Sequence, residues 1–93
     1  MDKIKINDIV SDLSTNASGF SLYCVLKTYF ESNTPVEVSF SGCSVMSTSF
    51  FNSSFGAFIE DFGFDTFKRI IKIVEIQKSQ AIILKRYFSY HTR

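Results

Sequence analysis

Three consecutive hydroxyl side chains, Ser47, Thr48 and Ser49, stand between a run of small residues and an aromatic-rich segment. If a helix begins at this point, a serine there can accept a hydrogen bond from a free backbone N–H and so cap the helix. The same hydroxyl could carry a phosphate, which would add nearly two negative charges to a docking surface. We expect Ser49 at the N-terminus of this helix, either as a plain cap or as a phosphoacceptor.

Catalysis by these hydroxyls is not indicated. The single histidine, His91, is far from Ser49 in the sequence, so a Ser–His or Cys–His pair would require a tertiary contact. The chain has no Walker-type loop and no dinucleotide glycine motif. Cys24 and Cys43 lack metal-ligand spacing and are expected to be buried thiols, and the acidic residues are scattered. The sequence therefore predicts a protein that is not an enzyme and holds neither a cofactor nor a metal.

The second chemically distinctive feature is a basic C-terminal segment. Residues 1–65 carry three Lys and eight acids, a net charge of −5, whereas residues 66–93 carry seven Lys or Arg and one acid, a net charge of +6. Such a segment is either a solvated face or a surface that contacts phosphates, with Tyr87 and Tyr90 available to stack on bases. The candidate nucleic-acid-binding residues are Lys72, Lys78, Lys85, Arg86 and Arg93.

The elements that position these residues follow from apolar spacing. Alternation predicts strands over 3–6, 36–40 and 69–76. Helical spacing predicts helices over 19–30, with Ser18 as N-cap, and over 49–62, ended by Gly63. Residues 7–17 read as a loop with one helical turn. Residues 79–90 fit either a helix or the second strand of a hairpin. We favour the helix, because Leu84, Tyr87, Phe88 and His91 then share one face.

The clearest periodic signal lies in the predicted helix 49–62. Phe51, Phe55, Phe58 and Phe62 follow one another at i, i+4, i+7 and i+11, which places four aromatic rings on one face. The order β-α-β-α-β-α predicts an α/β fold with a parallel or mixed sheet and right-handed crossovers. The 93 residues suit one domain spanning 1–93.

The segment from Val36 to Gly56 runs strand, Gly42, small-residue loop, Ser53-Ser54-Phe55 and aromatic helix. It resembles the central part of STAS domains, named for sulfate transporters and anti-sigma factor antagonists, and is closer still to the STAS-like group of unknown function. The spacing from Ile4 to Tyr90 is compatible with that fold. In signalling members, a Ser or Thr at the start of this helix is phosphorylated by a partner kinase, and the phosphate abolishes binding. Ser49 matches that position, with Thr48 beside it.

The resemblance implies an interaction module that docks a protein partner, such as a histidine-kinase-like ATPase, through the loop 42–49 and the start of the next helix. The expected contact residues are Met46, Ser47, Thr48 and Ser49. Two alternatives stay open: a nucleic-acid-associated protein using the basic segment, and a homo-oligomer, since eleven Phe can exceed what one core hides. No apolar run approaches the roughly 20 residues of a membrane span. The N-terminus also lacks a secretory signal, so we expect a cytoplasmic protein without membrane contact.

Overall fold

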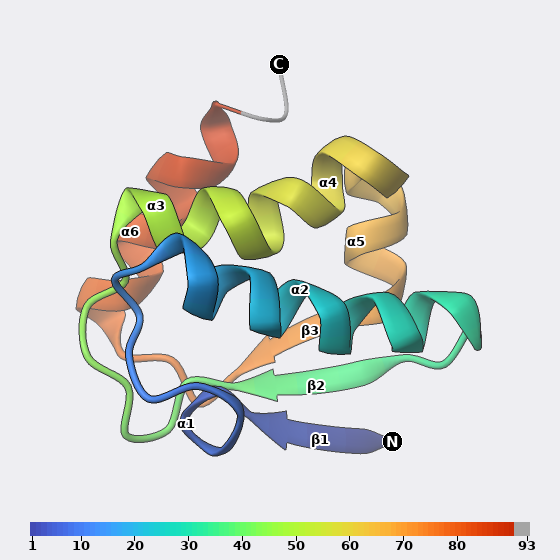
Figure 1. Cartoon of the computed structure of the whole chain (residues 1–93), viewed down its shortest axis with the longest axis horizontal. Helices are drawn as coiled ribbons and strands as arrows, with labels where there is room; N and C mark the ends of the chain where they lie inside the picture. The colour runs from blue at the N-terminus through green and yellow to red at the C-terminus, as the bar shows by residue number, and fades with distance from the viewer. Residues whose placement is uncertain (91–93) are drawn as a thin grey trace.

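The computed structural model describes residues 1–90. Its centre is a sheet of three parallel strands in the order β1-β2-β3 (Figure 1). The strands are β1 (Asp2–Lys5), β2 (Val36–Ser39) and β3 (Ile71–Val74). In this register Ile4 lies opposite Val38, and Val38 lies opposite Ile73. The predicted α/β class and parallel sheet are therefore confirmed.

Within residues 1–90, the helices pack on one face of the sheet. Because the strand order follows the chain order and parallel crossovers are right-handed, both connections must pass over the same face. Figure 1 shows α2 (Asn16–Glu31) and α4 (Ala57–Phe62) on this side. The opposite face carries the row Lys3, Glu37, Lys72 across the three strands. Parallel sheets are usually buried on both faces, and this alternation of cation, anion and cation allows one face to remain in water.

The helices differ from the prediction at the start of α2 and in an additional helix after Gly63. Helix α2 begins at Asn16, so Ser18 is not its cap: the Thr15 side chain accepts a hydrogen bond from the Ser18 N–H at 3.1 Å. Helix α5 (Phe64–Ile70) is absent from the predicted elements, and it shortens the predicted strand 69–76 to Ile71–Val74. The helical turn expected in the segment 7–17 is present as α1 (Ile6–Ile9), which follows β1 and holds the fully buried Ile6.

The helical alternative for the C-terminal segment is confirmed. Helix α6 (Lys78–Ser89) starts with a reciprocal cap, in which the Gln77 and Gln80 side chains each accept a backbone N–H of the other residue. Leu84 is buried on its inner face, and Tyr87 and Phe88 are half-buried there. His91, which was predicted to share that face, lies outside the described residues.

The aromatic segment forms one rod across the sheet, but it is not a uniform α-helix. Helix α3 (Thr48–Phe51) passes into a π-helical turn, η1 (Asn52–Gly56), and then into α4. Three rings of the predicted stripe, Phe51, Phe55 and Phe58, are fully buried, while Phe62 is half-buried. Phe55 stacks near Phe40, which follows β2, with ring centroids 6.1 Å apart. The stripe therefore faces the sheet, as predicted.

Helix α2 packs closely on the π-helical turn because Gly19 has no side chain. A Cβ atom at Gly19 would lie 1.9 Å from Ser53 Oγ and 2.7 Å from the Phe50 carbonyl oxygen. The same carbonyl accepts a hydrogen bond from the buried Ser54 hydroxyl at 2.7 Å. A π-helical turn replaces the i→i+4 backbone pattern with an i→i+5 pattern, and Ser54 adds a side-chain hydrogen bond within this turn.

We predict that Gly19→Ala destabilises the protein by about 1–3 kcal/mol, because the added methyl group overpacks the contact with Ser53 and Phe50. Helix propensity alone would stabilise the Ala variant by about 1 kcal/mol, so a net destabilisation must come from the steric overlap. Urea unfolding gives the free energy, with exposed Ser21→Ala in the same helix as control. A Gly19→Ala protein as stable as the wild type would contradict the close packing.

We also predict that Phe55→Ala lowers the free energy of unfolding by about 3–5 kcal/mol, because the side chain is fully buried and its removal leaves a cavity. The exposed Phe20 provides the control, since truncation there removes little buried surface. Equal losses of unfolding free energy in Phe55→Ala and Phe20→Ala would show that the stripe does not form the packed core.

Candidate functional site

The loop between β2 and α3 is the candidate site. It leaves the carboxyl end of β2, where open α/β sheets usually carry their binding loops. Gly42 turns the chain with a φ of +75°, a conformation that favours glycine. A Cβ atom at this position would also lie 2.9 Å from the Asn7 side-chain nitrogen. The glycine therefore fixes the path on which the rest of the loop depends.

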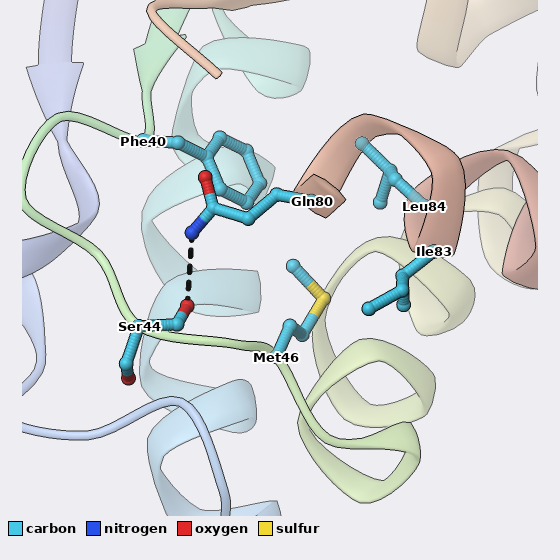
Figure 2. A pocket seen from close by; sticks show the side chains of 6 residues that line it. All are labelled: Phe40, Ser44, Met46, Gln80, Ile83 and Leu84. Carbon is cyan, nitrogen blue, oxygen red and sulfur yellow. Dashed lines mark hydrogen bonds between the residues drawn. The ribbon is translucent and has the colours of Figure 1, made fainter. Parts of the chain in front are cut away.

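On one side, α6 holds the loop by its backbone. The Gln80 side-chain amide donates to the carbonyl oxygens of Cys43, at 2.8 Å, and Ser44, at 3.0 Å. Figure 2 shows Gln80 reaching from α6 to the Ser44 carbonyl. The Tyr87 hydroxyl donates to the Met46 carbonyl oxygen at 3.3 Å. Three loop carbonyls are thus bound to side chains of one helix, which restrains the loop before any partner arrives.

On the other side, the segment 10–15 holds the loop at Ser47. The Ser47 N–H donates to the Leu13 carbonyl oxygen at 2.9 Å, and the Ser47 hydroxyl donates to the Ser14 carbonyl oxygen at 3.0 Å. The same hydroxyl accepts the Phe50 N–H at 3.0 Å, which makes Ser47 the N-cap of α3. The prediction that Ser49 caps this helix is therefore wrong, because the tertiary contacts select Ser47.

Asp12 organises the segment that holds Ser47. Its carboxylate accepts the backbone N–H groups of Ser14 and Thr15 and the Ser18 hydroxyl, at 2.9–3.2 Å. The hydrogen bond from the Ser14 backbone is the largest of the causes that lower the pKa of Asp12 to about 2. The ionised carboxylate is therefore the form that stabilises this turn.

The outer surface of the loop is uncharged and carries one large apolar side chain. Val45 is 62% exposed, and Ser44, Thr48 and Ser49 are also exposed. No charged residue occurs anywhere in residues 38–59. Met46, in contrast, is only 6% exposed, so its side chain belongs to the core and offers little surface to a partner. Val45 takes its place as the accessible apolar residue.

The hydroxyls of the three predicted site residues have different surroundings. The Ser47 hydroxyl is already hydrogen-bonded as the N-cap of α3. The Thr48 hydroxyl donates to the Tyr87 hydroxyl at 3.3 Å. The exposed Ser49 hydroxyl has no hydrogen-bond partner among residues 1–90. Ser49 is therefore the freest of the three to react or to be modified.

The space beneath the loop is small. Its lining is drawn in Figure 2, and its volume of about 10 Å³ is close to the space that one water molecule needs. Binding sites for small organic molecules usually measure about 300–1,000 Å³. This cavity therefore suits a water molecule at most, and the loop can act through its outer surface.

The other candidate residues are spread over the molecule. Lys72 lies in β3, whereas Lys78, Lys85 and Arg86 are exposed on α6, and Arg93 lies outside the described residues. Cys24 is exposed, so its prediction as a buried thiol is wrong, and Cys43 is half-buried with a pKa raised by desolvation. Within residues 1–90, no group of His, Cys, Asp or Glu is arranged to hold a metal ion.

The chain matches the family described as STAS-like domain of unknown function (DUF4325) over residues 22–81. It belongs to this family. The matched segment begins in α2, contains the whole candidate loop and ends in α6 just after Gln80. No curated protein and no solved structure matched the chain. None of the helices within residues 1–90 has the length and apolar character needed to cross a membrane.

The sequence indicates some of the residues that shape the loop surface, but not the side chains that hold the loop in place. Val45 is visible as a large apolar residue inside a run of small ones. Gln80 and Tyr87 give no local signal, because their partners are 36 to 41 positions away along the chain. These two side chains could be found only from the structure.

We predict different stabilities for two neighbouring serine variants. Ser47→Ala should lose about 1–2 kcal/mol, because it removes the cap of α3. Ser49→Ala should stay within about 0.5 kcal/mol of the wild type, since its hydroxyl is exposed and free. Urea unfolding of the pair provides the test. A larger loss in Ser49→Ala than in Ser47→Ala would contradict the assignment of the cap.

A pH dependence follows from Asp12. Its folded pKa of about 2 lies below the ordinary value near 3.9, so its stabilising effect is present above that ordinary value and is lost as the pH falls through 2. The melting temperature of the wild type should therefore exceed that of Asp12→Asn at neutral pH, and the difference should shrink toward zero near pH 2. A difference that does not change with pH would contradict the role of the ionised carboxylate.

Proposed function

We propose that this STAS-like protein is a non-catalytic interaction module that docks a protein partner through the loop 42–49. The observation that carries the proposal is Val45, a 62% exposed apolar side chain on a loop whose backbone is bound from both sides. Binding costs less free energy when a loop is ordered before the partner arrives. A rigid loop with one apolar residue and surrounding hydroxyls is thus suited to recognition of a protein surface.

Ser49 is the proposed point of regulation. Its hydroxyl is exposed and free, and Ser49 is the last residue of the docking loop. A phosphate on Ser49 would bring nearly two negative charges to a surface on which residues 38–59 carry none. A partner that covers an uncharged surface would have to desolvate that charge, and so would bind less tightly.

A histidine-kinase-like ATPase is the proposed partner class, by resemblance to the signalling STAS proteins. The homo-oligomer alternative draws less support from the side chains, since Phe20 is the one Phe among the exposed large hydrophobic residues of the described chain. The nucleic-acid alternative requires basic residues that lie on two separate elements, β3 and α6. The loop therefore offers the better-defined surface.

Titration against an ATPase of this class from the same genome tests the proposal. Val45→Asp and Ser49→Asp should each weaken binding by about tenfold or more, which corresponds to about 1.4 kcal/mol. Ser21→Asp adds the same charge at an exposed position of α2 and should leave the affinity within about threefold. Ser49→Ala should bind like the wild type.

The outcomes separate the parts of the proposal. Unchanged affinity in both Val45→Asp and Ser49→Asp, with the fold retained, would remove the loop from the interface. A loss in Val45→Asp alone would keep the docking loop and remove phosphorylation of Ser49 as its control. A wild type that does not bind the ATPase would contradict the partner class.

A further inference from the structure

The outer edge of β3 is unpaired within the described residues. Strand β3 pairs with β2 on one side, and the Val74 carbonyl oxygen accepts the Phe40 N–H at 3.1 Å. In a parallel pair, successive residues turn their backbone groups alternately to the two sides of the strand. The N–H and C=O of Ile73 therefore point away from β2. Such an edge can accept another strand by main-chain hydrogen bonds.

An apolar groove lies beside this edge, between β3 and α6. Its volume is about 320 Å³, and five of its six lining residues are apolar. Ile73, Ile76 and Phe88 are only half-buried, so part of their apolar surface is available to a ligand. The lining residues are Ile73, Ile76, Ala81, Leu84, Lys85 and Phe88. A strand added at the edge would place every second side chain toward this groove.

The charge around the groove is positive. Lys85 lines it and Lys78 is exposed on the same helix, whereas Lys72 lies beside this edge on the open face of the sheet, where it ends the row Lys3, Glu37, Lys72. The one acid of residues 66–93, Glu75, is already engaged: it pairs with Lys3 at 2.8 Å and accepts the Ser39 hydroxyl at 2.5 Å. In a strand added at this edge, the side chains that alternate with the groove-facing ones lie on the open face beside Lys72. An acidic residue there continues the alternation of cation, anion and cation across the sheet.

The same charges disfavour a second copy as the occupant. A symmetric dimer through two β3 edges would bring Lys72 of each copy toward Lys72 of the other. Like charges that face each other across strands are destabilising. We propose that the β3 edge and this groove bind an extended peptide of alternating apolar and acidic residues, which adds to the sheet as a fourth strand. This surface is separate from the loop 42–49.

The test is an NMR titration of the ¹⁵N-labelled protein with a short peptide of alternating Val and Glu. We expect saturable shifts of the backbone amides of residues 71–76 and of the groove-lining residues of α6. Lys72→Glu should weaken binding by about tenfold or more, since it reverses the charge on the face to which the acidic side chains point. Arg86→Glu is the control: it makes the same charge change at an exposed position of α6 that does not line the groove, and it should weaken binding by less than about threefold.

Two further variants test the groove by shape and leave its charge unchanged. Ala81→Phe should fill the groove and abolish the shifts, whereas exposed Ile82→Phe, one residue along and outside the groove, should preserve them. The proposal is overturned if the peptide shifts no residue of 71–76, or if it shifts only the loop 42–49. It is also overturned if a Val–Lys peptide binds equally well, or if the same amides shift with protein concentration alone, as they would in self-association.

Discussion

The described helices all cover the same face of the sheet, and the arrangement of the molecule follows from this constraint. With three parallel strands in chain order, both crossovers lie on the same side, so apolar burial is concentrated there. Phe51, Phe55 and Phe58 fill much of that layer and lie on a single rod. Each fully buried ring removes about 150–250 Å² of surface from water. A short chain can thus form a dense core from one aromatic segment.

The position of the candidate loop depends on this rod. The buried rings fix α3 against the sheet, and Ser47 joins the start of α3 to the segment 10–15. Helix α6 lies on the other side of the loop and binds its carbonyls through Gln80 and Tyr87. The outer loop surface, with Val45 and Ser49, is therefore held by polar contacts while its apolar Met46 points into the core. Because Met46 is buried while Val45 and Ser49 are exposed, the loop can be held in place and still offer a surface for docking.

The sequence predicts elements whose burial follows a simple period, and it fails where tertiary contacts decide. The Phe51, Phe55, Phe58 spacing and the alternation of Val36 and Val38 both appear in the structure as buried faces. The choice among Ser47, Thr48 and Ser49 as the cap cannot be read from residue type, because all three can cap a helix. Ser47 is selected by its contacts with Leu13 and Ser14, which are distant in the sequence.

The missed helix and the misjudged side chains have similar causes. Residues 69–74 contain four β-branched residues, which favour a strand. Ile70 is nevertheless the last residue of α5, because the helical conformation places both Phe67 and Ile70 in the core. Burial of Met46 and exposure of Cys24 depend on which way one loop and one helix are turned. Residue type gives only an average tendency in such positions.

The central claim is that the loop 42–49 is ordered before it meets a partner, and ¹⁵N relaxation of the free protein tests it most directly. The account predicts backbone order parameters at Ser44, Val45 and Ser47 near the value of about 0.85 that is typical of rigid backbone. It also predicts that Gln80→Ala, which frees the Cys43 and Ser44 carbonyls, lowers these values while the sheet stays rigid. Order parameters below about 0.6 in the wild-type loop would contradict the account.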